Sequence, residues 1–128
     1  MPKFSAKARR IKGLGKRSGP NFIQLFHYVK RSVEYHGLGL IARALLIELI
    51  DRYNGSNNGT IVLGRREAMY ELKCGADAVS SATRELDDAC LARPLLVGAW
   101  RGRQATEWRL MWCRCDKTGD LPRKALAP

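Results

Sequence analysis

The sequence predicts a single small domain of the α+β class, with a three-helix core and a short antiparallel sheet. Two periodicities support this prediction. Apolar residues recur at three- and four-residue steps through much of 39–90, and they alternate with polar residues over 107–112. The third observation is the stretch NGSNNG (54–59), which separates a strongly apolar helical pattern from the β-branched run TIVL (60–63).

Two apolar segments open the predicted domain. Residues 22–36 are apolar enough to pack, and their pattern leaves open whether they are helical or partly extended. Residues 39–53 have the clearest helical pattern, with a buried face formed by Ile41, Ala42, Leu45, Leu46, Leu49, Ile50 and Tyr53. Asn54 and Gly55 are expected to end this helix, because both residues tolerate the left-handed conformation. A strand is expected at 60–63.

Two further helices are predicted after this strand. The first begins near Gly64, with Glu67 placed so that its carboxylate can reach the N-terminal amides. Residues 73–76 break the pattern, and Gly75 is free to adopt a positive φ. The next helix spans 77–90, with an apolar face formed by Val79, Ala82, Leu86 and Cys90. A helix, a Gly-containing turn and a second helix form the outline of a helix-turn-helix.

A β-hairpin is predicted to follow. Residues 95–97 form its first strand, and GAWRGRQA (98–105) is a basic loop bracketed by glycine. In the second strand Trp108, Leu110 and Trp112 point to one side, whereas Glu107, Arg109 and Met111 point to the other. Trp108 and Trp112 are therefore expected in the core, and Trp100 is the better candidate for an exposed aromatic side chain. Two strands joined by a basic loop make a wing, so the predicted fold is a winged helix-turn-helix.

Charge is distributed unevenly along the chain. The protein contains 23 Lys and Arg against 12 Asp and Glu, a net charge of +11, and residues 1–18 hold seven of the basic residues and no acid. We expect a flexible basic arm at 1–20, the domain at 21–115 and a loosely ordered tail at 116–128. A basic arm on a mildly basic domain favours a polyanion as partner. The alternative is a solvated arm that only aids solubility.

Other functional classes find little support in the sequence. No apolar run approaches the ~20 residues that span a bilayer, and the N-terminus lacks the pattern of a secretory signal. We therefore expect a cytoplasmic, nucleoid-associated protein without membrane contact. The cysteines lack zinc-ligand spacing, so no metal site is expected. No catalytic motif or phosphate-binding loop occurs, so we expect no enzyme, no cofactor and no small-molecule ligand.

The stretch RSVEYHGLGLIARALLIELIDRYNGSNNGTIVLGRREAMYEL (31–72), with the later ATEWRL (105–110), resembles a group of small bacterial and phage helix-turn-helix proteins. The resemblance covers about residues 22–115. It implies a winged-helix DNA-binding protein whose third helix lies in the major groove and whose wing lies over the backbone or minor groove. Gly64 departs from the usual pattern, because Ser or Thr would commonly cap the second helix there. The presumed recognition face also departs from it by carrying acidic residues that repel phosphate, namely Asp77, Glu85 and Asp88.

Carried over by position, the resemblance points to DNA contacts on the third helix and in the wing. The helix supplies Ser80, Ser81 and Arg84, and the wing supplies Arg101, Arg103 and Gln104. Arg84 is the best candidate for a base contact, since Arg can form two hydrogen bonds to guanine. The alternative for Arg84 is an ion pair with Asp88, one helical turn further on.

Other basic residues are expected to contact phosphate. Arg101-Gly102-Arg103 is similar to the Arg-Gly-Arg cores that lie in narrow A·T minor grooves. Arg65 and Arg66 begin the second helix and Lys73 follows it, positions suited to phosphate contact. In the arm the candidates are Lys7, Arg9, Arg10, Lys12, Lys16 and Arg17.

The sequence therefore predicts a sequence-preferring protein that binds double-stranded DNA, a transcription regulator of a bacterium, phage or mobile element. One alternative is a replication initiator or an excisionase-like accessory factor, for which the same fold serves. Another is a winged-helix module that binds a partner protein through the acidic residues of its third helix. The oligomeric state is left open, although residues 22–36 could form a homodimer contact.

Overall fold

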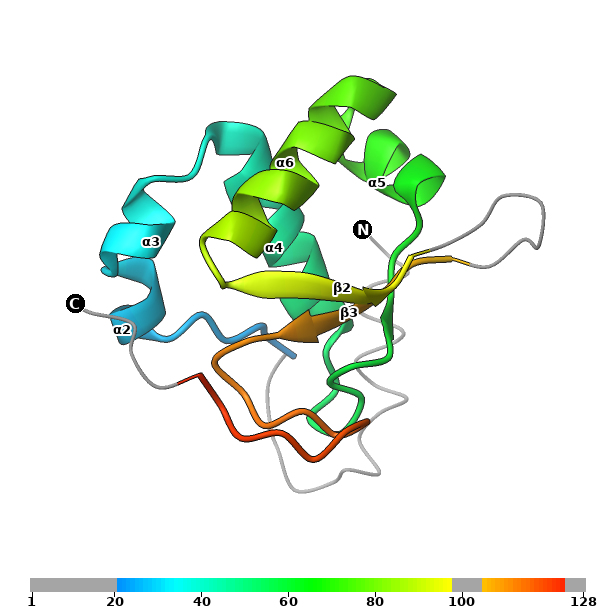
Figure 1. The fold of residues 1–128 in the computed structure, drawn as a ribbon. Helices are drawn as coiled ribbons and strands as arrows, with labels where there is room; N and C mark the ends of the chain where they lie inside the picture. Colours follow the sequence, from blue (N-terminus) through cyan, green and yellow to red (C-terminus); the bar gives the residue numbers. More distant parts are fainter. Residues whose placement is uncertain (1–20, 98–104, 124–128) are drawn as a thin grey trace.

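The computed structural model describes residues 21–97 and 105–123 (Figure 1). Its elements are, in order, α2 (His27–Lys30), α3 (Val33–His36), α4 (Leu40–Arg52), β1 (Ile61–Val62), α5 (Arg65–Leu72), α6 (Ala76–Asp88), β2 (Ala92–Leu96) and β3 (Glu107–Leu110). Within the described residues, five helices accompany one three-stranded antiparallel sheet, so the α+β class is confirmed. None of the helices in this part of the chain is long and apolar enough to cross a membrane.

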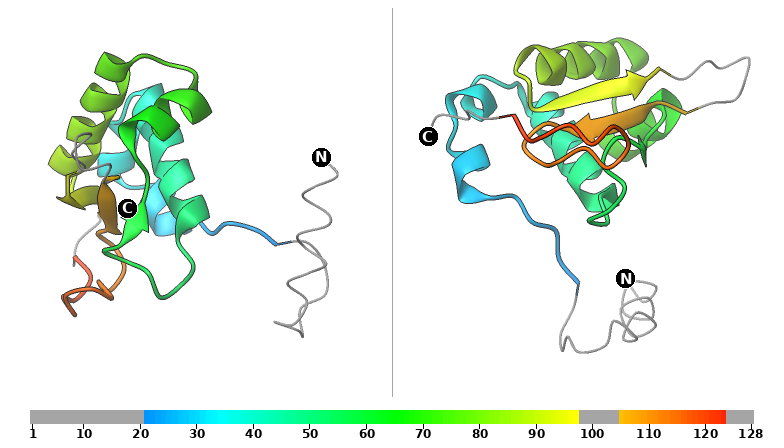
Figure 2. Two further views of the ribbon diagram at one scale, coloured as in Figure 1. Left: turned by 90° about the vertical axis from the view of Figure 1, so that its right-hand side faces the viewer. Right: turned by 60° about the horizontal axis from the view of Figure 1, so that its bottom comes forward.

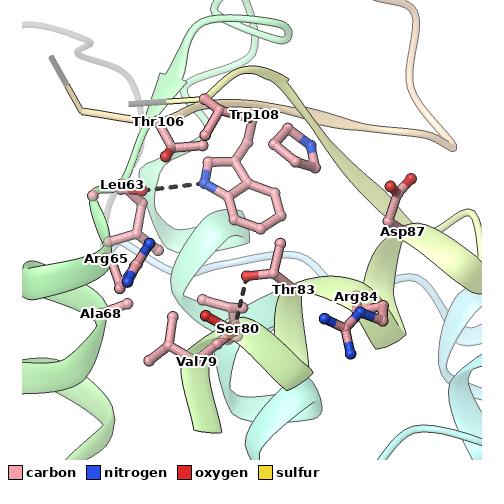
Figure 3. A pocket seen from close by; sticks show the side chains of 14 residues that line it. Leu63, Arg65, Ala68, Val79, Ser80, Thr83, Arg84, Asp87, Thr106 and Trp108 are labelled. Atoms are coloured by element: carbon pink, nitrogen blue, oxygen red, sulfur yellow. Dashed lines mark hydrogen bonds between the residues drawn. The ribbon is translucent and has the colours of Figure 1, made fainter. Parts of the chain in front are cut away.

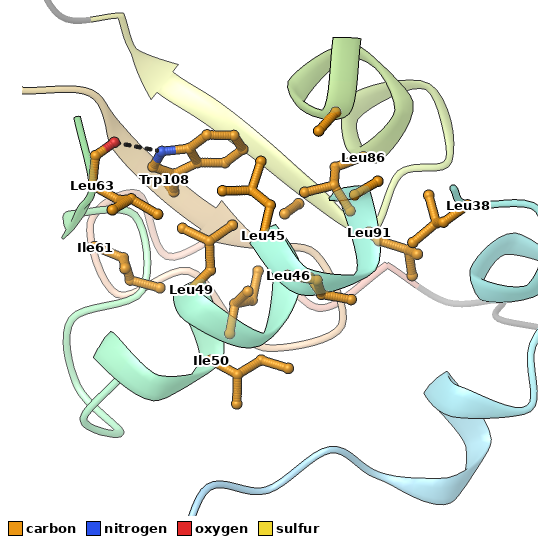
Figure 4. Close-up of a cluster of buried hydrophobic side chains, with 14 of the residues drawn as sticks. Leu38, Leu45, Leu46, Leu49, Ile50, Ile61, Leu63, Leu86, Leu91 and Trp108 are labelled. Carbon is orange, nitrogen blue, oxygen red and sulfur yellow. Dashed lines mark hydrogen bonds between the residues drawn. The ribbon is translucent and has the colours of Figure 1, made fainter. Parts of the chain in front are cut away.

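Helix α4 is the centre of the core (Figure 4). The predicted apolar face is largely confirmed, because Ala42, Leu45, Leu46, Leu49 and Ile50 are all buried. Helix α6 packs across α4, and α5 contacts both of these helices. These helices bury their apolar stripes against one another and against the sheet, which leaves the opposite side of α6 facing solvent.

The strand order is β1-β3-β2, so β3 is central and β2 is an edge strand. Ile61 of β1 lies opposite Trp108 of β3, and Ala92 of β2 lies opposite Leu110. The register of the β2–β3 pair shifts between Pro94 and Leu96. An edge strand tolerates Pro94, because one side of such a strand has no partner strand and does not need every amide donor.

Trp108 and Trp112 belong to the core, as predicted. Trp108 is 3% exposed and Trp112 is 6% exposed. The Trp108 indole Nε1 donates to the Leu63 carbonyl at 3.2 Å, which fixes the ring and satisfies its only polar atom (Figure 4). Trp100 lies outside the described residues.

The NGSNNG stretch connects α4 to β1. Gly55 and Gly59 have φ of 94° and 101°, values that favour glycine. The Asn57 side chain accepts from the Asn54 amide and donates to the Arg52 carbonyl, which closes the end of α4. Asn58 is fully buried and bonds across the chain to residues 110–117. The stretch is therefore a helix stop, a strand start and a long-range anchor.

Two local predictions about the helix-turn-helix are wrong. Lys73, not Gly75, has the positive φ of 54°, and Gly75 is the extended N-cap of α6 with φ of −85°. Glu67 does not cap α5, which has no side-chain cap. Its carboxylate instead binds Arg52 at 2.7 Å, because a guanidinium from the neighbouring α4 is a stronger partner than an amide in its own helix.

The C-terminal segment also differs from the prediction. Residues 116–123, expected to be loosely ordered, fold back over the sheet, with the Arg123 amide donating to the Met111 carbonyl at 2.7 Å. This segment covers Arg109, which the strand alternation places on the exposed side and which is only 8% exposed. Arg109 donates to the Leu121 carbonyl at 2.8 Å, so the burial of its guanidinium is partly compensated.

The segment 22–36, whose type the sequence leaves open, contains both short helices and extended chain. Residues 27–30 and 33–36 form α2 and α3, and Ser32 caps α3 by accepting from the Tyr35 amide at 3.1 Å. The segment 21–26 runs outward from the helices and the sheet in both views of Figure 2, although Leu25 packs against the core.

Candidate nucleic-acid interface

Helix α6 has two chemically different sides. Val79, Ala82 and Leu86 are buried against the core, as predicted. Ser80, Ser81 and Arg84 are all exposed. The structure thus places the three predicted recognition-helix residues on the solvent side of one helix, where a large partner can reach them.

Arg84 has no ion-pair partner among the described residues. The predicted alternative, a pair with Asp88 one turn further on, is absent from the ion pairs of the described chain. Its guanidinium extends into solvent beside Thr83 (Figure 3). All five donors of this group are consequently available to a ligand.

The acidic residues of α6 do not act as a single repulsive face. Glu85 accepts from the Gly39 amide at 2.7 Å and so supplies the N-terminus of α4 with a carboxylate. Asp87 forms an ion pair with Arg93 at 2.6 Å, and this hydrogen bond raises the pKa of Arg93. Of the charges predicted to repel phosphate, Asp77 and Asp88 are exposed, whereas Glu85 is half-buried and engaged. The field in front of Arg84 is therefore less negative than the sequence suggests.

The start of α5 adds cations beside α6. Arg65 and Arg66 are exposed and have no ion-pair partner among the described residues. Gly64 leaves the first amides of α5 without a side-chain cap. Lys73 is exposed in the turn that leads into α6. The residues predicted to contact phosphate are therefore exposed, and a helix N-terminus and exposed cations both attract an anion.

A cavity of about 320 Å³ lies between α5, α6 and the β2–β3 hairpin (Figure 3). Leu45, Leu63, Val79 and Trp108 contribute apolar walls. Arg65 stands at one side of the opening and Arg84 at the other, with Ser80 between them (Figure 3). The cavity therefore joins the two groups of candidate residues, those of α5 and those of α6.

The remaining predicted contacts lie outside the described residues. They are the wing residues Arg101, Arg103 and Gln104 and the arm residues Lys7, Arg9, Arg10, Lys12, Lys16 and Arg17. The strands on either side of the wing residues, β2 and β3, pair with each other in antiparallel fashion.

Two arginines that form ion pairs with acidic residues near this surface were not identified from the sequence. Arg93 neutralises Asp87, and Arg52 holds both Glu48 and Glu67. Although burial opposes it, the hydrogen bonds to Glu67 and Glu48 raise the pKa of Arg52. The Glu48–Arg52 pair has helical i,i+4 spacing and could have been found in the sequence. The Asp87–Arg93 pair joins a helix to a strand, and no local pattern announces it.

No group of three or more potential metal ligands occurs in the described part of the chain. The chain matches no protein-family model, no curated protein and no solved structure.

Proposed function

We propose that this protein is a winged helix-turn-helix protein that binds double-stranded DNA, with α6 as its recognition helix and the β2–β3 hairpin as its wing. The order α4, β1, α5, α6 and hairpin supports this assignment, as does the short turn of residues 73–75 between α5 and α6. A 13-residue helix with one face exposed can enter a major groove, which admits an α-helix.

The observation that carries the proposal is that Arg84 is exposed, has no ion-pair partner among the described residues, and lies one turn after two exposed serines. A guanidinium without an internal partner can bind a base edge directly, whereas one held in an ion pair must first break that pair. Ser80 and Ser81 can donate to or accept from bases and phosphates. The ion pair between Asp87 and Arg93 neutralises one acid of α6 and so removes part of the repulsion that the helix would otherwise exert on phosphate.

Phosphate contacts position such a protein on the duplex. Arg65 and Arg66 at the start of α5, and Lys73 in the turn, are suited to contact the backbone on either side of the groove that α6 enters. The basic arm adds affinity that depends on salt and not on sequence. We infer a transcription regulator, because modest sequence preference together with strong electrostatic attraction suits a factor that searches along DNA.

The decisive experiment is selection of bound sequences from a random duplex pool at two salt concentrations. The proposal predicts an enriched motif with a guanine whose identity matters, and affinity that falls steeply as salt rises. Failure to shift any duplex at low salt, with a stable complex formed with a partner protein instead, would favour the protein-interaction module. A motif confined to origins or attachment sites would favour a replication initiator or an excisionase-like factor.

A further inference from the structure

We propose that the cavity between α5, α6 and the hairpin binds a small organic anion, namely a carboxylate on a compact apolar body, and that this ligand competes with DNA. The binding site stands on the geometry of the cavity alone. Only the competition rests on the proposed function.

The inner wall of the cavity is apolar and already formed. Leu45, Leu63 and Val79 are buried residues of the core, so their side chains are held in place by packing on their far sides. The Trp108 indole has its Nε1 bonded to the Leu63 carbonyl, so the ring presents only carbon atoms to the cavity. A phosphate group alone would gain nothing from this wall, whereas an apolar body would be removed from water.

The rim of the cavity carries an excess of positive charge. Arg65 and Arg84 stand on its two sides without an ion-pair partner among the described residues. The one carboxylate that lines the cavity, Asp87, is neutralised by Arg93. An anionic head at the rim can therefore pair with a guanidinium, in the planar geometry that Arg and carboxylate share.

Hydroxyl groups between the two arginines complete the rim. The Thr83 hydroxyl already donates to the Val79 carbonyl at 2.9 Å, so it retains only accepting capacity (Figure 3). The exposed Ser80 hydroxyl has its donor available. The rim thus offers donors from Arg65, Arg84 and Ser80, a set that selects an acceptor-rich head group.

The volume limits the size of the ligand. A cavity of about 320 Å³ lies near the lower end of the ~300–1,000 Å³ typical of ligand pockets. One ring or one short branched chain fits this space together with a carboxylate. A monocyclic aromatic acid is the simplest member of this class.

Occupation of the cavity would interfere with α6. The carboxylate would neutralise Arg84 and hold its side chain at the rim, and the ligand would lie beside Ser80. Both residues belong to the proposed DNA-contacting face. The ligand and the duplex would then bind in competition, each lowering the affinity for the other.

The test is a titration of the full-length protein with benzoate, followed by the amide and side-chain N–H resonances in two-dimensional NMR. We expect saturable shifts of the Trp108 indole N–H and of the Ser80 and Thr83 amides, with half-saturation on the order of 1 mM for so small a ligand. Benzamide has the same ring without the charge, and acetate has the charge without the ring. Both should bind at least about tenfold more weakly.

Variants separate the cavity from general charge. Arg84→Gln and Arg65→Gln should each weaken benzoate binding about tenfold, because each removes a charge-assisted hydrogen-bond donor from the rim. Arg31→Gln removes the same charge from an exposed residue at the end of α2, which lies on the opposite side of α4 and α6 from α5 (Figure 1), and should leave benzoate binding unchanged. The site would be overturned if no resonance shifted at a benzoate concentration 20-fold above the expected half-saturation point. It would also be overturned if all three variants lost the same amount of benzoate affinity.

Competition is measured separately, by titrating a labelled duplex with the protein at constant ionic strength. Saturating benzoate should lower the apparent affinity about tenfold, and benzamide should not. Benzoate binding without any effect on a duplex that the protein does bind would overturn the competition. Benzoate binding by a protein that binds no duplex would leave the anion site standing and would count against the proposed function alone.

Discussion

Asn58 and the outward face of α6 show two opposite uses of polar side chains. The Asn58 side chain is fully buried and donates to the carbonyls of Leu110, Cys113 and Arg114, while its Oδ1 accepts from the Leu110 amide at 2.6 Å. Arg84 on α6 is exposed and has no ion pair among the described residues. The first region satisfies its polar groups internally, and the second leaves them for a partner.

This difference separates stability from binding. A saturated buried group stabilises the fold, because removing it strands partners that cannot reach water. An exposed unsaturated group contributes little to stability and is free to bind. Asn58, within the stretch NGSNNG, belongs to the first kind, and Arg84 belongs to the second. Asn58 stabilises the fold and says little about what α6 contacts.

The largest effect should come from Asn58→Ala. The substitution removes the side chain that joins the 54–59 stretch to Leu110 and to the carbonyls of Cys113 and Arg114, and it leaves several buried groups without this partner. We expect the free energy of unfolding to fall by about 3–5 kcal/mol. Urea denaturation followed by circular dichroism measures this loss.

The matched control is Asn54→Ala, in the same stretch but exposed and bonded only within the turn. Its cost should be below about 1 kcal/mol. Equal losses in the two variants would show that turn chemistry, and not the long-range anchor, accounts for the stability of this region.

A pair of glycine substitutions separates packing from backbone strain. Gly59→Ala places a Cβ 2.7 Å from both the Cys115 Sγ and the Lys117 Cβ at a φ of 101°, whereas Gly55→Ala at a φ of 94° meets nothing within 4 Å. We expect losses of about 3 kcal/mol at Gly59 and about 1 kcal/mol at Gly55. Thermal unfolding of both variants tests this, and a Gly55 loss as large as that at Gly59 would contradict the tight contact.

The smallest expected change in stability comes from substituting two acidic residues of α6, which should differ from each other. Glu85→Ala removes the carboxylate that accepts from the Gly39 amide, and should lower the free energy of unfolding by about 0.5–1.5 kcal/mol. Asp88→Ala removes an exposed acid from the last turn, where the helix dipole disfavours it, and should leave stability unchanged or slightly raised.

The two acids should also differ toward DNA. Asp88→Ala should raise the affinity for random duplex at low salt, because a charge that repels phosphate is removed. A stability loss from Asp88→Ala, or none from Glu85→Ala, would show that the assignment of engaged and free acids on α6 is wrong.

The helices of the fold follow from local periodicity. The buried sides of α4 and α6 could be predicted because their apolar residues recur at helical steps, as Val79, Ala82 and Leu86 do. The core position of Trp108 follows from strand alternation, whereas Trp112 is buried in the turn that follows β3. The exposure of Ser80, Ser81 and Arg84 could be predicted from helical periodicity, because they lie away from the buried side of α6.

The features that the sequence does not reveal depend on contacts between distant segments. Strand alternation places Arg109 in solvent, but the segment ending at Arg123 covers it. Glu67 has the spacing of a helix cap, but Arg52 of α4 is the stronger partner. The sequence predicts that Asn58 is a turn residue, and only the fold brings it beside Leu110. Local pattern predicts which face of an element is buried, but not which distant residue meets it.

The proposed function depends most on one contact, a hydrogen-bonded contact between the Arg84 guanidinium and a base. The most direct measurement compares Arg84→Ala with Arg31→Ala in fluorescence-anisotropy titrations of the selected duplex and of a random duplex, at the same salt concentration. We predict that Arg84→Ala lowers the ratio of specific to random affinity by about 1–3 kcal/mol, while stability changes by less than about 0.5 kcal/mol and Arg31→Ala leaves the ratio unchanged. An equal loss on both duplexes after Arg84→Ala would contradict the claim.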